Sequence, residues 1–302
     1  MTSESASLSI QPIEKTTRSV LVVADSEMNW MQFDYLVAKE WTIEYVASNR
    51  LAMEAIGKRH FDLIVTSEVT SAFDDLKLLR QIRALRPHTR MILLTNEGTT
   101  ADVIEALRQR AFSFFSKPYS FETLSQMIHM AMEEPCWDDG IEVLSATPTW
   151  IRLLVRCEIG TAERMAIFFN EIVELPELEA AQIGAAFREM LLNAIGHGAG
   201  FNPQQYVEIS YVKARHAVAC RVKDPGQGFS FDELFKVAVA DPIDDSRPMK
   251  GKSPAGSQGW GNYGILLARH LVDDLIYNEQ GNDVLLIKYL NPPQPAPGGV
   301  PL

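Results

Sequence analysis

Short apolar runs alternate with amphipathic helical patterns over the first 132 residues. The run SVLVVA at 19–24 is short and β-branched, as expected of a parallel strand that is buried on both faces. The pattern predicts strands at 19–24, 42–47, 62–67, 90–95 and 111–116, and helices at 29–39, 50–58, 75–84, 100–109 and 120–132. Strands and helices in strict alternation predict an α/β fold with an open, doubly wound parallel sheet of flavodoxin-like type.

Polar residues follow several of these predicted strands. Ligands of a doubly wound sheet bind at the carboxyl ends of its strands, so the loops after the first, third, fourth and fifth strands are expected to converge. These loops carry Asp25, Ser67, Thr95 and Lys117–Pro118. A candidate site therefore lies at this edge of the sheet.

The second half of the chain has a different order of elements. Strands at 141–146 and 150–158 precede a helix that starts near Thr161 and a second helix that begins near Glu177. A strand hairpin follows, and then a glycine-led helix whose apolar positions continue to Leu275 and Ile276. A last strand over 283–290 closes this domain.

The helix from Glu177 contains the stretch AAFREMLLNAIGHGAG. Glu189, Asn193 and His197 are spaced by four, which places them on one face of an α-helix. Each has an ordinary explanation: a hydrogen bond inside the helix for Asn193, and a capping interaction beside Gly198 for His197. Three polar residues in one line are costly to bury without partners, so together they indicate a site.

Glycine-rich segments flank the second half of this domain. In DPGQGF, Asp224 follows a strand, and Gly226 and Gly228 let the backbone approach a flat ligand, although such a segment can also be only a turn. The stretch 241–258 has no apolar period and predicts a mobile lid. Gly259, Gly261 and Gly264 are expected to precede a helix whose free amides can bind phosphate.

Composition narrows the class of protein. Hydrophobic residues make up 46% and charged residues 22% of the 302 residues, as in soluble globular proteins. The net charge of −11 argues against direct nucleic-acid binding, and no apolar run is long enough for a membrane span. The three scattered cysteines predict neither a disulfide framework nor a metal site, and so favour a cytoplasmic protein.

Over its full length, the first half resembles the receiver domain of bacterial response regulators. Thr95 and Lys117–Pro118 match that family's pattern, and Asp25 matches one member of its acidic pair, whereas Ala24 replaces the other member. Ser67 stands where the family has its phosphorylated aspartate. Acyl phosphate formation needs a carboxylate nucleophile and a carboxylate-held cation, so we expect a degenerate receiver that accepts no phosphate.

This resemblance raises two further questions. Lys117 would either remain unpaired or pair with Asp25, because Glu68 would point to the opposite face of a continuing strand. The aromatic residues Phe112, Phe114, Phe115 and Tyr119 would either form core or provide a surface for docking or for homodimer formation.

The second half resembles the ATPase superfamily of gyrase, heat-shock chaperones and histidine kinases, and within it the anti-sigma-factor serine kinases. The resemblance rests on the order Glu189-x-x-x-Asn193, Asp224-x-Gly226-x-Gly228, lid and Gly259-x-Gly261-x-x-Gly264. It implies an α/β sandwich that binds ATP and Mg²⁺. Asn193 would coordinate the magnesium, Glu189 would be the general base, and Asp224 would bind the adenine amino group.

The same resemblance assigns further positions. His197 and the glycines would line the nucleotide site, and Arg247, Lys250 or Lys252 of the lid could meet the γ-phosphate or simply face solvent. Leu285 occupies a position where the superfamily often has a threonine near the adenine.

Two functions follow as hypotheses. The first is an ATP-dependent protein-serine kinase that phosphorylates a small antagonist protein in a partner-switching pathway and could hold a sigma factor when that antagonist is phosphorylated. The second is a nucleotide-dependent module that sequesters its partner without phosphate transfer. Retention of Glu189 favours the kinase, because a pure binder needs no base.

The expected organisation has two domains. A tail over 1–17 precedes the receiver-like domain over 18–133. A linker over 134–140, with Pro135 and Gly140, leads to the ATPase-like domain over 141–291 and a Pro/Gly-rich tail over 292–302. The helix before the linker could run on toward the second domain.

Overall fold

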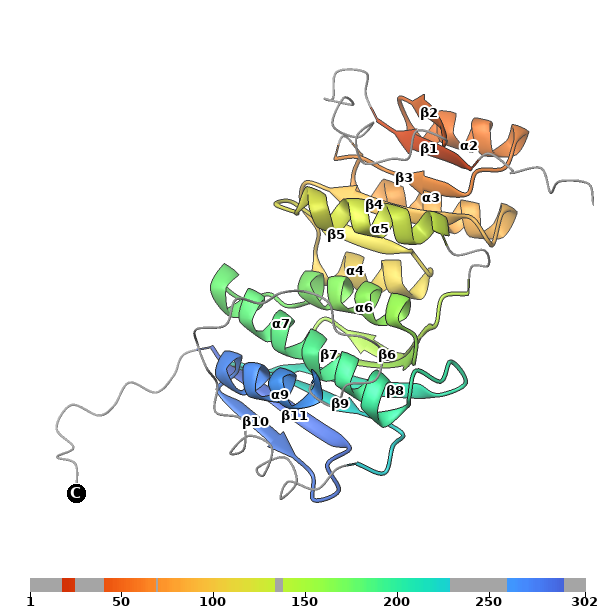
Figure 1. The fold of residues 1–302 in the computed structure, drawn as a ribbon. Helices are drawn as coiled ribbons and strands as arrows, with labels where there is room; N and C mark the ends of the chain where they lie inside the picture. Colours follow the sequence, from red (N-terminus) through yellow and green to blue (C-terminus); the bar gives the residue numbers. More distant parts are fainter. Residues whose placement is uncertain (1–17, 25–40, 69, 134–137, 229–259, 291–302) are drawn as a thin grey trace, which may run out of the picture.

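The computed structural model describes residues 18–24, 41–68, 70–133, 138–228 and 260–290. Two sheets with their helices make up these residues (Figure 1). The predicted helix over 29–39, the lid over 241–258, both tails, Asp25 and Gly259 lie outside the described residues.

The first sheet is parallel and has the strand order β2-β1-β3-β4-β5. This order confirms the predicted flavodoxin-like sheet. Its strands are β1 (Ser19–Val23), β2 (Thr42–Val46), β3 (Leu63–Val65), β4 (Arg90–Thr95) and β5 (Ser113–Ser116). Its described helices are α2 (Asn49–Lys58), α3 (Ala72–Leu85), α4 (Thr100–Arg108) and α5 (Phe121–Glu133).

Three of these helices begin at residues that the sequence supplies as caps. The side chains of Ser48, Ser71 and Thr99 accept hydrogen bonds from backbone amides in the first turns of α2, α3 and α4. At α4, Asp102 completes a capping box by accepting from the Thr99 backbone amide. Local sequence thus fixes where these helices start.

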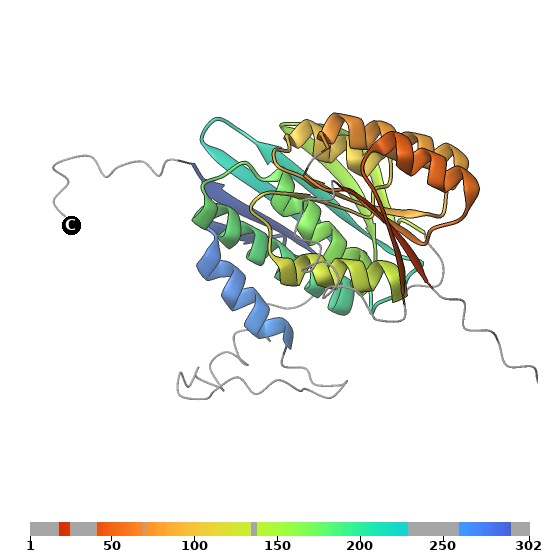
Figure 2. The same cartoon turned by 90° about the horizontal axis from the view of Figure 1, so that it is seen from above.

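The second sheet is antiparallel and has the strand order β10-β11-β9-β8-β7-β6. It comprises β6 (Ile141–Thr147), β7 (Trp150–Arg156), β8 (Tyr206–Lys213), β9 (Ala217–Lys223), β10 (Asp274–Tyr277) and β11 (Asp283–Tyr289). The helices α6 (Ile159–Ile172), α7 (Glu177–Asn193) and α9 (Trp260–Leu271) cover one face of it (Figure 2).

The pattern of burial shows which face of this sheet is the inner one. Along β7, Ile151, Leu153 and Val155 are buried, and the residues between them are more exposed. Between the sheet and the helices, Phe169 of α6 stacks on Phe187 of α7 with ring centroids 3.9 Å apart. The core of the second half therefore lies between α6, α7 and one sheet face.

The last helix ends earlier than its apolar pattern predicts. α9 stops at Leu271, and Leu275 and Ile276 belong to β10, where they pair with Leu286 and Leu285 of β11. The Asp273 amide already donates to the Ile287 carbonyl at 3.0 Å. Pairing with β11 therefore overrides the helical period from this residue onward.

The two halves meet through the last part of the first sheet. Helix α6 lies beside α4 and β5 (Figure 1), and the buried hydrophobic side chains of the two halves form one continuous cluster. Phe112 and Phe115 are buried in a second cluster and Phe114 in the first, so these aromatic residues are core. Phe114 thus lies on the side that the second half covers, Phe112 and Phe115 pack with α5, and Tyr119 is half-buried and donates to Glu68.

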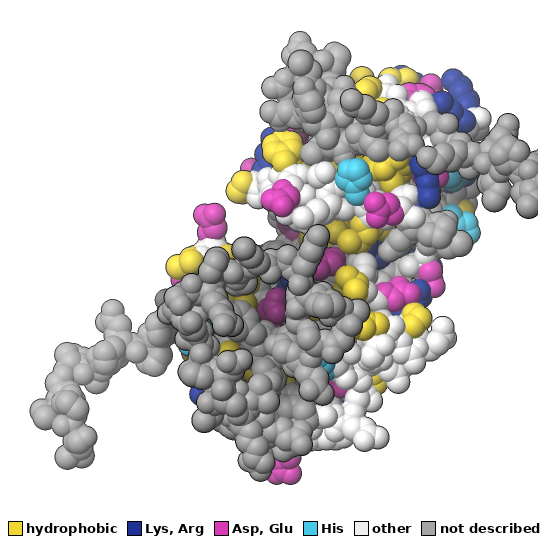
Figure 3. Space-filling model, in the orientation of Figure 1, with side chains coloured by type: hydrophobic (Ala, Val, Ile, Leu, Met, Phe, Trp, Pro, Cys, Tyr) yellow, Lys and Arg dark blue, Asp and Glu magenta, His cyan; other side chains and the backbone are white. Residues whose placement is uncertain are grey.

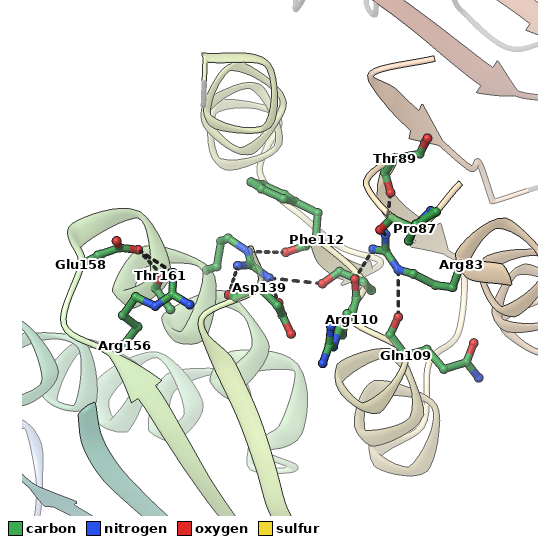
Figure 4. Close-up of polar contacts among 12 residues, drawn as sticks. Arg83, Pro87, Thr89, Gln109, Arg110, Phe112, Asp139, Arg156, Glu158 and Thr161 are labelled. Atoms are coloured by element: carbon green, nitrogen blue, oxygen red, sulfur yellow. Dashed lines mark hydrogen bonds and ion pairs between the residues drawn. The ribbon is translucent and has the colours of Figure 1, made fainter. Parts of the chain in front are cut away.

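A buried arginine forms the centre of this interface. The Arg164 side chain on α6 is 2% exposed. It donates to the Phe112 carbonyl at 2.8 Å, to the Ala111 carbonyl at 3.3 Å and to the Asp139 carbonyl at 2.7 Å, and it pairs with the Asp139 carboxylate at 2.6 Å. Figure 4 labels two of these partners, Phe112 and Asp139.

A second, partly buried arginine braces the same region from the first half of the chain. Arg83 of α3 donates to the carbonyls of Gln109 at 3.1 Å and Thr89 at 2.7 Å, and also to that of Arg110 (Figure 4). Burial lowers its pKa to about 10. The turn between α4 and β5, which carries the carbonyls that Arg164 binds, is thereby held from its other side.

Further hydrogen bonds join the halves at the carboxyl end of β5. Ser116 donates from its backbone amide, at 3.1 Å, and from its hydroxyl to Glu171 of α6. Thr100 of α4 donates to Glu174 at 2.5 Å, and Arg108 donates to the Ala146 carbonyl at 2.7 Å. The two halves are therefore connected by a packed interface. Helix α5 ends at Glu133, and Asp138 is not helical, so the described part of the linker does not continue the helix.

The surface is mixed in character. Acidic, basic and hydrophobic side chains are interspersed over the described part of the face in Figure 3. Among the described residues, no helix combines the length and the apolarity that crossing a bilayer requires.

Candidate functional site

Helix α7 brings Glu189 and Asn193 together against α9. A Cβ atom built on Gly264 would lie 2.8 Å from Glu189 Oε2 and 3.3 Å from Asn193 Nδ2. Both side chains, one helical turn apart on α7, therefore meet the backbone of α9 at the one residue type that leaves room for them. The predicted grouping of these three residues is present in the structure.

The carboxamide of Asn193 has an unmet hydrogen-bonding need. Its Nδ2 atom is buried and has no hydrogen-bond partner among the described residues. Buried polar atoms without partners are rare in native structures and call for an explanation such as a bound group. The two amide atoms are interchangeable by a flip, so this position can present either a donor or the oxygen ligand that Mg²⁺ prefers.

His197 lies apart from this pair. The α-helix ends at Asn193, and a π-helical turn follows over Ala194–Gly198, in which the Ala199 amide donates to the Ala194 carbonyl at 3.0 Å. The wider turn changes the angular position that the spacing of four predicts. His197 is exposed, and no hydrogen bond or ion pair joins it to Glu189 or Asn193 within the described structure.

Asp224 lies at the end of β9, beside this π-helical turn. A Cβ atom on Gly198 would collide with the Asp224 side chain, 2.6 Å from its Cβ. The carboxylate accepts from the Gly226 amide at 2.7 Å, and burial raises its pKa. This carboxylate therefore has a fixed orientation and a partly buried setting, which suits recognition of an amino group.

The glycines after Asp224 are required by the protein's own packing. A Cβ atom on Gly226 would lie 2.5 Å from the Gly198 carbonyl oxygen. Gly228 has φ +80° and lies against the Gln280 carbonyl. From the sequence, we interpreted these glycines as positions where the backbone approaches a ligand closely. The structure shows that they also let two backbone segments of the protein approach each other closely.

Asn282 fixes the same loop and was not found from the sequence. Its side chain donates to the Gly226 carbonyl at 2.9 Å, and its own carbonyl accepts from the Asp224 amide at 3.0 Å. The stretch around it, NEQGN, has the composition of an ordinary turn, so no sequence signal marks this role.

Two other expectations about the second half need correction. Gly261 and Gly264 lie within α9, which begins at Trp260, instead of preceding the helix. Leu285 faces away from the site, because its neighbours Val284 and Leu286 point inward and side chains alternate along a strand. With Trp150 and Arg152, it lines a pocket of about 330 Å³ on the outer face of the sheet. The comparison of Leu285 with a threonine near adenine is therefore wrong.

The degenerate site of the first half contains an ion pair that we did not expect. Lys117 Nζ lies 3.3 Å from Glu68 Oε1, and the Tyr119 hydroxyl donates to the same carboxylate. The alternation argument for Glu68 fails because β3 ends at Val65, so the chain has already turned at Glu68. Lys117 is thus paired, with a residue that neither of our alternatives included.

Ser67 and Thr95 are both buried at this edge. Ser67 is 2% exposed, and its hydroxyl has no hydrogen-bond partner among the described residues. The Thr95 hydroxyl donates to the Glu97 carbonyl at 3.0 Å. Ser67 and Lys117 follow β3 and β5, and Thr95 is the last residue of β4, so all three lie at the predicted edge of the sheet. Among the described residues at this edge, Glu68 is the acidic group that pairs with Lys117.

Comparison with protein-family models gives two matches that divide the chain. Residues 20–129 match the response regulator receiver domain. Residues 158–288 match the histidine kinase-like ATPase domain.

Relatives with curated descriptions match part of the chain. The transcriptional regulatory protein GlrR of Escherichia coli K12 is 23% identical over 139 residues, which are 45% of this chain and 31% of that protein. RprY of Bacteroides fragilis is 25% identical over 113 residues, 37% of this chain and 48% of the relative. The matched segments thus span between about a third and a half of these relatives.

Solved structures similar to the chain include two receiver proteins. The receiver domain of an HD domain-containing protein from Pseudomonas fluorescens is 22% identical, with TM-score 0.35, and the match covers 39% of this chain and 95% of that one. CheY4 of Vibrio cholerae is 22% identical, with TM-score 0.34, over 38% of this chain and 99% of that one.

Proposed function

Because the chain carries a response regulator receiver domain over 20–129 and a histidine kinase-like ATPase domain over 158–288, we propose that it is an ATP-dependent protein-serine kinase of a partner-switching pathway. Its substrate in this proposal is a small antagonist protein with a phosphorylatable serine. A sigma factor, held when the antagonist is phosphorylated, is the further partner.

The observation that carries this proposal is the meeting of Glu189 and Asn193 at Gly264. The Asn193 carboxamide, whose buried Nδ2 atom has no hydrogen-bond partner among the described residues, is suited to hold a magnesium ion on the nucleotide phosphates. Bound magnesium would supply charge neutralisation at the γ-phosphate. Asp224, whose carboxylate is oriented by the Gly226 amide, is suited to the adenine amino group.

Glu189 has the properties of a general base. Its side chain is 30% exposed, so a partner's hydroxyl can reach it. It lies one helical turn from the proposed magnesium ligand, within reach of an alcohol aligned on the γ-phosphate. Its carboxylate would accept the serine proton as the hydroxyl oxygen attacks phosphorus and ADP leaves.

The receiver domain acts in this proposal by contact and not by accepting phosphate. The acceptor position holds Ser67, which is 2% exposed, and Lys117 is already paired with Glu68. The α4–β5 face is packed on α6 of the ATPase domain through Arg164 and Glu171. A signal that changes the receiver would therefore reach α6 directly.

The test starts with nucleotide binding. Isothermal calorimetry of the full chain with Mg·ATP should show binding, and Asn193→Ala should weaken it. Absence of any nucleotide affinity in the wild-type chain would overturn the assignment.

Phosphate transfer is tested separately. The chain is incubated with γ-labelled ATP, Mg²⁺ and the soluble proteins of its native cell, and labelled proteins are analysed for phosphoserine. Glu189→Gln should bind Mg·ATP normally and lose transfer by about 10²–10⁴-fold. Undiminished transfer would rule out Glu189 as the base, and binding without transfer would favour the non-catalytic sequestering module.

A further inference from the structure

Arg188, the residue before the proposed base, is held in a fixed position by α6. Its Nε atom donates to Glu163 Oε2 at 2.9 Å, and its Nη2 atom donates to Glu163 Oε1. Two parallel bonds between a guanidinium and a carboxylate fix the plane of both groups. The hydrogen bond to Glu163 also raises the pKa of Arg188, so this side chain is charged.

The remaining nitrogen of the same guanidinium faces Glu189. Arg188 Nη1 lies 3.6 Å from Glu189 Oε1. Within the described ranges, Arg188 is the one cation at ion-pair distance from this carboxylate. The other oxygen, Oε2, points to α9, where it would be 2.8 Å from a Cβ atom on Gly264.

The two carboxylate oxygens of Glu189 therefore have different surroundings. Oε1 faces a fixed positive charge, and Oε2 faces the place where Asn193 and α9 meet. A carboxylate attracted by one oxygen cannot rotate freely, so its other oxygen keeps one direction. This arrangement is the one that a base needs if it is to accept a proton from a single direction.

The anchor of Arg188 is itself immobilised. Glu163 is followed on α6 by Arg164, which binds the receiver backbone at Ala111 and Phe112. Neighbouring residues on a helix point in different directions, so α6 presents one to the receiver and the other to α7. The position of Arg188 is thus set by a helix that is packed between the two domains.

We propose that Arg188 is a positioning residue: clamped by Glu163, its guanidinium orients the Glu189 carboxylate so that Oε2 accepts the proton of the attacking hydroxyl. This inference rests on the proposed kinase function. A mere surface ion pair would contribute little to stability and nothing to turnover.

The experiment compares full-length variants in Mg·ATP turnover. Phosphate release to water is measured with and without the acceptor protein found by the labelling experiment, and Mg·ATP affinity is measured by calorimetry. The variants are Arg188→Ala, Arg188→Lys and Glu163→Gln. Lysine keeps the charge but cannot form the two-pronged bond, so it should restore part of the activity.

Arg152→Ala is the matched control. Arg152 pairs with Glu208 at 2.7 Å, and their side chains are 44% and 26% exposed. The side chains of Arg188 and Glu163 are 44% and 25% exposed, so the two ion pairs match closely in exposure. It lies on the outer face of the sheet, away from Glu189. Its loss should leave kcat, KM and nucleotide affinity unchanged.

The expected result is a fall in kcat of about ten- to a hundred-fold for Arg188→Ala, with Mg·ATP affinity unchanged. Glu163→Gln should reduce kcat in the same direction by less. Normal turnover in Arg188→Ala would overturn the inference and leave the kinase intact. Nucleotide binding without turnover in the wild type would overturn both the inference about Arg188 and the kinase proposal, and would favour the sequestering module. Absence of nucleotide binding would overturn the proposed ATP site.

Discussion

Asp75 is a buried acid that forms no ion pair with any cation in the part of the chain that the structure describes. It is 0% exposed in the first turn of α3 and accepts hydrogen bonds from Asn49 Nδ2 and from the Thr70 hydroxyl, each at 2.9 Å. Burial raises its pKa from 3.8 to about 6. The folded state therefore binds a proton more readily here than the unfolded state does, and this linkage affects stability.

The sign of the effect gives a first prediction. The stabilising contribution of protonated Asp75 to the free energy of unfolding is fully present below its unfolded pKa of 3.8. This contribution is lost as the pH rises through the folded pKa of about 6. Asp75→Asn removes the charge, so the variant should be more stable than the wild type at pH 8 by up to about 3 kcal/mol, and should show no such gain at pH 4. Urea unfolding at several pH values measures this.

The control for that series is Glu54→Gln. Glu54 is half exposed and pairs with Arg50 on the surface of α2. Its replacement should change stability little at any pH. A loss of stability in Asp75→Asn that is the same at pH 4 and pH 8 would contradict the predicted linkage.

Replacement of Ser67 gives a second prediction. Ser67→Asp supplies a nucleophile, but Ala24 still leaves the cation one carboxylate short, and Lys117 remains paired with Glu68. Treatment with acetyl phosphate and Mg²⁺ should therefore add no phosphoryl group, as measured by intact mass. Ala24→Asp/Ser67→Asp is the comparison in which modification becomes feasible, and phosphorylation of the unmodified receiver would contradict our account.

At the scale of elements, the packing of α9 on α7 depends on Gly264. Glu189 and Asn193 lie so close to this residue that a methyl group would have to displace one of them. Gly57 in α2 is the opposite case, because nothing lies within 4 Å of its Cβ position. The two glycines thus separate the effect of crowding from the effect of helix propensity.

Alanine substitutions at these glycines should have opposite effects. Gly57→Ala should stabilise the fold by about 1 kcal/mol through helix propensity. Gly264→Ala should destabilise it through overpacking against Glu189 Oε2, the atom that the new methyl group would overlap, and should weaken Mg·ATP binding because Asn193 must also shift. Thermal unfolding and calorimetry measure the two effects, and a stabilising Gly264→Ala would contradict the described contact.

The sequence correctly predicted those elements whose local pattern fits only one type of secondary structure. The parallel strands are short β-branched runs, and their order follows from alternation with helices. It failed for Leu275 and Ile276, because their spacing fits a helix as well as the strand that β11 pairs with. It also failed for Glu68, because the predicted strand was extended through the polar residues to Ser67, whereas β3 ends at Val65, the last residue of the apolar run.

The candidate site could be predicted in part for similar reasons. The separation of Glu189 from Asn193 is a helical repeat, so their proximity follows from the spacing. The position of His197 depends on a π-helical turn, which no spacing rule indicates. The roles of Arg188 and Asn282 depend on partners more than 20 residues away in sequence, so local patterns carry no sign of them.

At the scale of the whole molecule, the two domains share a buried ion pair. Arg164 and Asp139 are 2% and 7% exposed in their side chains, and they lie between β5 and β6. Burial raises the pKa of Asp139, and the Arg164 guanidinium opposes that rise. Removal of one partner would leave an uncompensated charge inside the interface.

Asp139→Ala should therefore destabilise the full chain by about 3–5 kcal/mol. It should also separate the unfolding of the receiver domain from that of the ATPase domain, which differential scanning calorimetry would detect as a second transition. Asp138→Ala is the adjacent control, because Asp138 is 69% exposed and pairs only at the surface with Arg156. Equal effects of the two substitutions would contradict a structural role for the buried pair.

Arg164 recognises the receiver at Ala111 and Phe112 through their main-chain oxygens. At Ala111 this bond goes to an oxygen that every amino acid offers, whereas at Phe112 the guanidinium also lies over the aromatic ring, 4.7 Å from its centroid. A substitution at Phe112 would therefore remove an aromatic contact with Arg164 as well as core packing, while the main-chain bonds would persist as long as the path of the backbone is preserved. A joint of this kind constrains the path of the backbone at both positions and the type of side chain at Phe112.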